Sequence, residues 1–242
     1  MDDGTWVEPS TNQPVSATAA EEILDDSLLC EPLGTLVEEP SFAVLGDSLM
    51  DFTTDGNCRH VADHMSFLTN KTIPSFAVGG ASFTGTRPKT IGLQYDRARE
   101  HAALQGTKLK TVIFDGGGND ILWGNELACL FPNSPRCDDM MDWVEREWVN
   151  MVETMQERDG VATVVYVGIY KMQGIWGLYG RAFEKFKHRM VDLCAAYGVV
   201  HVDLEPVFEG RSDEWMAPDK LHPNNRGTYA IAAAILAALE GN

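Results

Sequence analysis

From Ser41 onward, short apolar segments alternate with longer segments whose apolar residues recur at helical spacing. Five segments have the length and the β-branched or aromatic content of buried strands: Phe42–Leu45, Ile73–Val78, Thr111–Phe114, Ala162–Ile169 and Val199–Val202. Helical spacing fills the intervals, over His60–Leu68, Leu93–Leu104, Asp138–Arg158, Arg181–Tyr197 and Pro223–Glu240. Apolar strands separated by helices predict a parallel sheet covered on both faces, which is a three-layer α/β/α sandwich.

Two residues mark expected helix ends. Gly198 is expected to end the helix over Arg181–Tyr197, because glycine readily adopts the left-handed conformation that closes many helices. Pro223 is expected in the first turn of the last helix, where its missing N–H costs nothing.

The first forty residues differ from the rest. Residues 1–40 contain ten Asp or Glu and no Lys or Arg, with Pro, Ser and Thr between them. Such a segment has little capacity to fold alone, apart from a short helix expected around Ala19–Leu29. We therefore expect an acidic arm over residues 1–40 and one domain over residues 41–242, a length that fits a single core.

The formal net charge of −17 argues against two classes of anionic binding partner. Phosphates of nucleic acids and anionic membrane surfaces are bound through Lys and Arg, so neither is an expected partner. The charge is compatible with a neutral or cationic small-molecule substrate, or simply with a well-solvated surface. No apolar stretch approaches the ~20 residues of a membrane-spanning helix. The oligomeric state does not follow from the sequence.

Five cysteines are present, at positions 30, 58, 129, 137 and 194. They show no CxxC spacing and no nearby histidine cluster, so we expect no metal site. Cys129 and Cys137 bracket a short loop and are either a disulfide or two unpaired thiols. A disulfide would favour a secreted or periplasmic location. The N-terminal residues lack the basic start and apolar core of a signal peptide, so the compartment stays open.

Polar or glycine-rich segments follow the predicted strands or precede the last helix: Gly46–Leu49, Val78–Ser82, Asp115–Asp120 and Asp219–Pro223. In open parallel sheets, active sites form beyond the carboxyl ends of the strands, so these segments are expected to converge. A serine hydroxyl becomes nucleophilic when a neighbouring imidazole takes its proton and a carboxylate orients that imidazole. Ser48, His222 and Asp219 supply these three groups.

Acyl transfer also needs donors for the oxyanion of the tetrahedral intermediate. The N–H of Ser48, the N–H of Gly80 and the side-chain amide of Asn119 are the candidates, with Gly79 as the alternative glycine. Each residue alone has a plainer interpretation, such as a helix-capping serine or a loop asparagine. Asp120 is expected to hold loop backbone. The combination of all four segments favours catalysis.

The four segments resemble those of the SGNH (GDSL-type) hydrolase family, in the family's order. GDSL stands at Gly46–Leu49, the glycine of the second block at Gly80, GxND at Gly117–Asp120 and DxxHP at Asp219–Pro223. The chain departs from the family at Ser75–Ala77, where an Asn is frequent. The resemblance implies a flavodoxin-like, five-stranded parallel sheet and esterase, lipase or thioesterase activity without a metal or other cofactor.

The expected function is hydrolysis of carboxylic esters, with a short acyl group, through an acyl-enzyme on Ser48. Alternatives are a lysophospholipase, a thioesterase or an acyltransferase with the same residues, and a non-catalytic carbohydrate-binding domain. Trp176, Tyr170 and Phe83 are candidate pocket residues, since aromatic side chains beside the catalytic edge can line a substrate site. The other interpretation is that these aromatic side chains only pack against their own loops.

Overall fold

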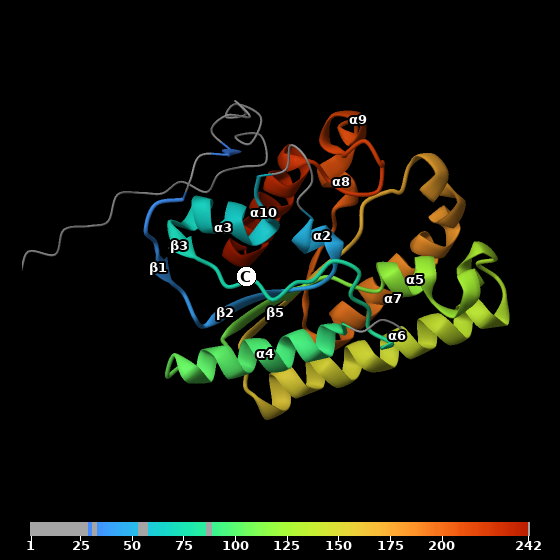
Figure 1. Cartoon of the computed structure of the whole chain (residues 1–242). Helices are drawn as coiled ribbons and strands as arrows, with labels where there is room; N and C mark the ends of the chain where they lie inside the picture. The colour runs from blue at the N-terminus through green and yellow to red at the C-terminus, as the bar shows by residue number, and fades with distance from the viewer. Residues whose placement is uncertain (1–28, 31–32, 53–57, 86–88, 242) are drawn as a thin grey trace, which may run out of the picture.

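The computed structural model describes residues 29–30, 33–52, 58–85 and 89–241. Its centre is a parallel sheet of β2 (Phe42–Leu45), β4 (Thr111–Phe114), β5 (Thr163–Val167) and β6 (Val200–Val202), in the order β2-β4-β5-β6 (Figure 1). The register places Val44 opposite Ile113 and Ile113 opposite Val165.

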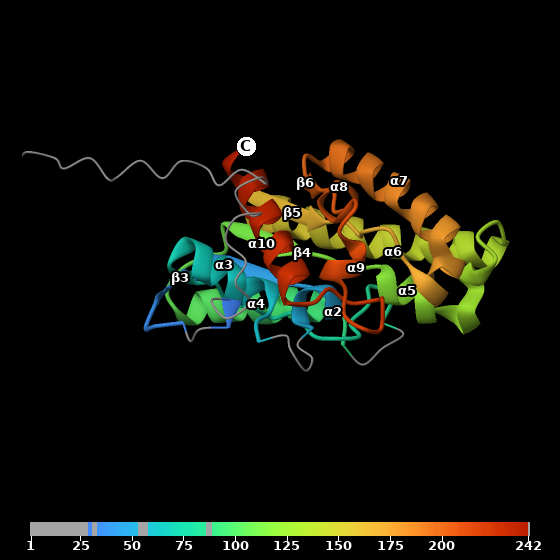
Figure 2. The same cartoon turned by 90° about the horizontal axis from the view of Figure 1, so that it is seen from above.

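Helices cover both faces of this sheet (Figures 1 and 2). On one face, α4 (Ile91–Leu104), α6 (Pro135–Glu153) and α7 (Gly180–Tyr197) share a core with Phe114 and Tyr166. On the other face, α3 (Val61–Thr69) and α10 (Asn225–Glu240) share a core with Ile113 and Val165. Successive strand residues alternate between the two cores, as the pleat requires. The predicted three-layer α/β/α sandwich is confirmed.

Short elements connect these layers. They are β1 (Val37–Glu38), α2 (Ser48–Asp51), β3 (Lys71–Thr72), α5 (Gly118–Trp123), η2 (Asn125–Leu130), η3 (Thr154–Arg158), η4 (Gly174–Tyr179), α8 (Glu205–Phe208) and α9 (Ser212–Trp215). In the described parts of the chain, no helix has both the length and the apolar content to cross a membrane.

The predicted fifth strand at residues 73–78 does not form, so the central sheet has four strands. The segment does run beside β2: the Val44 N–H donates to the Pro74 carbonyl at 3.0 Å and the Phe76 N–H to the Val44 carbonyl at 2.8 Å. The next ladder bond is lost because the Gly46 N–H donates instead to Oε1 of Gln94, at 2.6 Å. The Val78 N–H still donates to the Gly46 carbonyl at 3.0 Å. Without the bond from the Gly46 N–H, however, the pairing amounts to one isolated bridge, between Val44 and Ser75.

The helices predicted after Ser41 all form, with ends that differ by up to three residues, and α6 begins at Pro135 and passes into η3 at Thr154. The last helix begins at Asn225, not at Pro223, because the Asn224 side chain caps it by accepting from the N–H groups of Arg226 and Gly227. Gly198 ends α7 as predicted, in the left-handed conformation with φ of 62°.

The predicted acidic arm lies mostly outside the described residues, and so does most of the helix expected over residues 19–29. Of its described part, Leu29 is buried and Cys30 forms a disulfide with Cys58. Residues of β1 pair in parallel with β3. A boundary at residue 40 stays a prediction.

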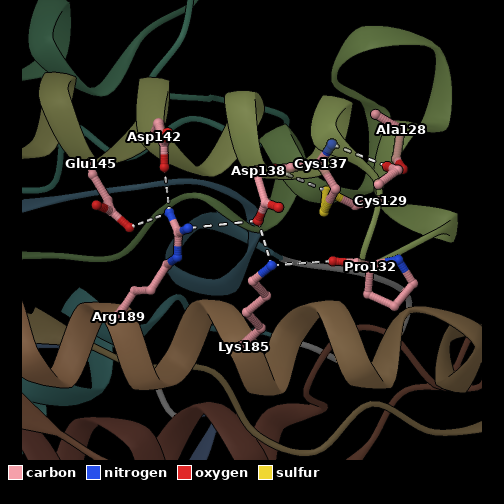
Figure 3. Close-up of polar contacts among 10 residues, drawn as sticks. Ala128, Cys129, Pro132, Cys137, Asp138, Asp142, Glu145, Lys185 and Arg189 are labelled. Carbon is pink, nitrogen blue, oxygen red and sulfur yellow. Dashed lines mark hydrogen bonds and ion pairs between the residues drawn. A yellow bond between two sulfur atoms is a disulfide. The ribbon is translucent and has the colours of Figure 1, made fainter.

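Figure 3 shows how α7 is held against α6. Arg189 pairs with Asp142 and Glu145, both at 2.7 Å, and Lys185 forms an ion pair with Asp138. A disulfide joins Cys129 to Cys137 at the start of α6, so this pairing is confirmed, while the Cys194 thiol is free and buried. These ties position α7, which forms one wall of the pocket described below.

Candidate active site

Ser48 is the first residue of α2, directly after β2. Its neighbour Asp47 caps the helix, accepting the Leu49 N–H at 2.9 Å. The Ser48 N–H therefore lies among the first amides of a helix, which have no acceptor within the helix itself. The residue is half-buried and its side chain faces a pocket at the carboxyl end of the sheet.

Ser48, His222 and Asp219 come together at this edge. Nε2 of His222 lies 2.8 Å from Oγ of Ser48, and Nδ1 of His222 lies 2.7 Å from Oδ2 of Asp219. The other oxygen of Asp219 accepts the N–H groups of Leu221 and His222, each at 3.0 Å. Burial alone would raise the pKa of Asp219, but these hydrogen bonds and the imidazole hold it below its usual value.

Neighbouring aromatic residues hold the turn that carries Asp219 and His222. Nε1 of Trp176, in η4, donates to the Asp219 carbonyl at 3.0 Å. The Tyr170 hydroxyl donates to the Leu221 carbonyl. The Phe52 ring stacks on the His222 ring, with ring centroids 3.8 Å apart. The turn of Asp219 and His222 is thus fixed by contacts to two other segments.

Both glycines of the second block lie beside α2, and they differ in their hydrogen bonds. The Gly79 N–H donates to Oδ2 of Asp51 at 2.8 Å, so it already has an acceptor other than an oxyanion. Gly80 lines the pocket with φ of 79°, a conformation that glycine adopts without strain. This difference favours Gly80 over Gly79 as the oxyanion donor.

The Asn119 side chain, in α5, already has two acceptors. Its Nδ2 donates to Oδ2 of Asp47 at 3.1 Å and to the Ala81 carbonyl at 2.9 Å. To bind an oxyanion, the amide must exchange one of these acceptors for the substrate oxygen. Asp120 holds loop backbone as expected, accepting from the N–H groups of Phe83 and Thr84.

Asp47 and Asp115 form a buried carboxyl pair beneath Ser48. Oδ1 of Asp115 accepts the Asp47 N–H at 2.9 Å. Burial raises the pKa of Asp115 well above its usual range, and the charge of Asp47 adds to this shift. We therefore assign the proton of the pair to Asp115 and the negative charge to Asp47, whose carboxylate accepts from Leu49 and Asn119.

The pocket beside Ser48 has a volume of about 450 Å³. Of the three candidate pocket residues, Tyr170 lines it. Phe83 instead packs in the core shared by α4, α6 and α7, and Trp176 acts on the catalytic turn through its bond to Asp219. Sequence reasoning missed the lining contributed by α7, which consists of Phe183, Phe186, Lys187 and Met190. The helical spacing of the three apolar residues marked them only as core.

The described residues contain no group of three or more His, Cys, Asp or Glu side chains placed to hold a metal ion. The prediction of a metal-independent site rests on the sequence and stays a prediction.

At the carboxyl edge of a parallel sheet, a serine lies within hydrogen-bond distance of a histidine, and that histidine contacts an aspartate. This arrangement in an α/β/α sandwich is typical of a serine hydrolase. The chain belongs to the GDSL-like lipase/acylhydrolase family, whose model matches residues 44–230. The SGNH resemblance seen in the four motifs is thereby confirmed.

Individual relatives are distant. The spore germination lipase LipC of Bacillus licheniformis is 23% identical over 138 residues, which cover 55% of this chain and 65% of that relative's length. The lipase Lip_vut3 from a goat rumen metagenome has a similar fold, with a TM-score of 0.63 and 21% identity over 84% of this chain and 97% of its own. The acetylxylan esterase Axe2 of Geobacillus stearothermophilus gives a TM-score of 0.56 at 13% identity, over 85% and 96% of the two chains.

Proposed function

We propose that this protein hydrolyses carboxylic esters through an acyl-enzyme on Ser48. The observation that carries the proposal is the chain of contacts from Ser48 Oγ to His222 Nε2 and from His222 Nδ1 to Asp219, at 2.8 Å and 2.7 Å, at the wall of a pocket. No other described serine is placed against a histidine and a carboxylate in this way.

In the first half of the reaction, Oγ of Ser48 attacks the ester carbonyl carbon while Nε2 of His222 takes the hydroxyl proton. Asp219 stabilises the imidazolium. The carbonyl oxygen becomes an oxyanion, and the proposed donors to it are the N–H groups of Ser48 and Gly80 and the Asn119 amide, which must first give up one of its two present acceptors. The ester bond then breaks, and the leaving alcohol departs with the proton from His222.

In the second half, His222 takes a proton from water as the water oxygen attacks the acyl carbon. The intermediate collapses, the carboxylic acid is released, and the proton returns to Oγ of Ser48. The balance is one water consumed for each ester cleaved, and no cofactor is required.

The length of the acyl group is the finer part of the proposal. The sequence predicts a short acyl group, and Axe2, whose name describes an acetylxylan esterase, has a similar fold. The volume and apolar walls of the pocket favour the alternative, a lipase- or thioesterase-like enzyme with a longer acyl group. Initial rates on p-nitrophenyl esters from acetate to palmitate separate these two predictions.

The test of the proposed function is Ser48→Ala, with Ser75→Ala as the matched control on an exposed serine that lies beside β2. We expect Ser48→Ala to lower kcat by about three orders of magnitude or more while the thermal unfolding curve is kept. Ser75→Ala should keep wild-type activity. A fluorophosphonate should label the wild type and the control rapidly, and Ser48→Ala not at all. Absence of labelling in the wild type would instead favour a non-catalytic binding domain.

A further inference from the structure

The pocket continues well past Ser48, across the carboxyl ends of the strands. Its lining begins with Ser48 after β2, passes Gly118 after β4 and Gly168 after β5, and includes His201 of β6. Neighbouring strands lie ~4.8 Å apart, so three strand spacings give a run of about 14 Å. A pocket of this extent is larger than an acetyl group needs.

The far part of the pocket, called here the α7 chamber, has apolar walls. It is lined by Phe183, Phe186 and Met190 of α7, with Ile169 and Met172 from the segment after β5. Lys187 is the cation among the lining residues of α7, and its ammonium is paired with Asp203 at 3.1 Å and Glu205 at 2.7 Å. The chamber therefore offers an alkyl chain a mainly apolar lining in which the nearby cation is already paired, with Tyr166 and His201 as polar lining residues.

The pocket wall formed by α7 is held in place by its contacts to α6 and to the sheet. The ion pairs of Lys185 and Arg189 with α6 lie on the neighbouring face of the same helix (Figure 3). Phe186 and Met190 belong to the buried core that joins α7 to the sheet. The chamber is thus bounded by a packed helix.

Gly118 stands at the passage from Ser48 to the α7 chamber. A Cβ at this position would lie 3.7 Å from Oδ2 of Asp47 and 3.8 Å from Cδ1 of Ile169, both pocket-lining residues on opposite sides of β4. Gly118 is the first residue of α5 and does not have a positive φ, so its backbone accepts other residues. The missing side chain therefore leaves the passage open without being required by the backbone.

The leaving alcohol of the ester is expected on the solvent-exposed side of the site. The leaving alcohol must depart beside His222, which protonates it, and the neighbouring Asp219 side chain is 41% exposed. The part of the pocket beyond Gly118 is then left for the acyl chain.

We infer that the α7 chamber binds the alkyl part of a medium-length acyl group, and that Gly118 is the residue that admits it. An extended chain with C–C bonds of about 1.5 Å needs on the order of ten carbons to fill a run of about 14 Å. The inference rests on the proposed function for its acyl-enzyme, but the chamber itself can be tested without catalysis.

The kinetic test compares p-nitrophenyl decanoate with p-nitrophenyl acetate. The variants are Gly118→Ala and Gly118→Val, with Gly92→Val as the control on an exposed helical glycine that has open space around its Cα. In the wild type, kcat/KM is expected to be higher for decanoate. Because one methylene in an apolar pocket changes selectivity by ~10- to 200-fold, Gly118→Val should lower the decanoate-to-acetate ratio about a hundredfold. Gly118→Ala should lower it less, and Gly92→Val should leave the ratio unchanged.

The binding test uses 1-decanol, a neutral alkyl probe, and the Ser48→Ala protein, so no turnover is involved. Saturating 1-decanol should raise Tm, and the same protein with Gly118→Val should show no rise. If Gly118→Val abolishes the decanol stabilisation but the wild-type protein cleaves none of the esters, the chamber is supported and the proposed function is contradicted. A wild type that cleaves acetate far better than decanoate, or a decanol effect that Gly118→Val leaves intact, would overturn the chamber and leave the esterase proposal standing.

Discussion

The Phe52 ring lies flat against the imidazole of His222, with ring centroids 3.8 Å apart and planes inclined by 11°. Phe52 directly follows α2, whose first residue is Ser48, so one helical turn carries both the serine and the ring that covers its base. The face of a benzene ring is electron-rich and attracts a cation more than a neutral ring. In the proposed reaction, the stack therefore favours the imidazolium that forms when His222 takes the serine proton.

Replacing Phe52 by Leu, which removes the aromatic face but keeps an apolar side chain, should lower kcat by about 3- to 30-fold, the range expected for loss of a cation–π contact. Phe52→Tyr keeps the face and should stay close to wild type. Phe131→Leu, on a phenylalanine that is 73% exposed, serves as the control. The measurement is kcat and KM for each variant on one ester. If Phe52→Leu raises KM and leaves kcat unchanged, Phe52 only lines the pocket.

Asn119→Ala should lower kcat by about 10²- to 10³-fold with little change in KM, because an oxyanion donor acts mainly in the transition state. The structure offers a competing role, since Nδ2 of Asn119 also ties Asp47 to Ala81. A purely structural residue would instead lower Tm and leave kcat within a few-fold of wild type. Measuring kcat, KM and Tm on the same preparation distinguishes the two roles.

The buried Asp115 should make the protein less stable as pH rises. Its pKa in the folded protein is raised, mainly by burial, so the folded state holds a proton that the unfolded chain releases near its ordinary pKa. The stabilising contribution is complete below the ordinary Asp pKa and is lost as pH rises through the raised one. Asp115→Asn keeps a neutral side chain of the same shape. Its Tm should therefore fall less than the wild-type Tm between pH 5 and pH 8. Equal falls in both proteins would contradict a protonated Asp115.

The layers and the positions of Ser48, Asp219 and His222 were predictable because they depend on local patterns. Apolar strands, helical spacing and the rule that polar segments gather at the carboxyl edge act over short stretches of sequence. The missing fifth strand was not predictable in this way. It depends on Gln94, nearly fifty residues away from Gly46 along the chain, taking the hydrogen bond that pairing required.

The residues that line the pocket were likewise not predictable from local sequence patterns. Trp176, Tyr170 and Phe83 are all aromatic, but Tyr170 alone among them lines the pocket. Phe83 turns into the core, and Trp176 bonds to the Asp219 carbonyl. The Cys30–Cys58 disulfide was missed for a related reason, because its two halves are brought together by the packing of separate segments. Side-chain direction depends on the neighbours that the fold supplies.

The role of Asp219 is tested by Asp219→Asn, with Asp213→Asn as the control. Asp213 is a carboxylate with a side chain 92% exposed, which pairs with Lys220 on the same turn. Against the effect of burial, hydrogen bonds and the neighbouring imidazole hold the pKa of Asp219 below its usual value, so the carboxylate is ionised near neutral pH and its own protonation should not limit activity there.

In Asp219→Asn, an amide N–H facing Nδ1 of His222 favours the tautomer that carries its proton on Nε2, the nitrogen next to Ser48. That nitrogen then cannot accept the serine proton, so kcat should fall by about 10³- to 10⁴-fold at pH 8 with the fold retained. Asp213→Asn removes a nearby charge without touching the imidazole and should stay within a few-fold of wild type. If Asp219→Asn kept the wild-type rate and fluorophosphonate labelling, the site would be a Ser48–His222 dyad, and Asp219 would serve only to shape the turn through the Leu221 and His222 N–H groups.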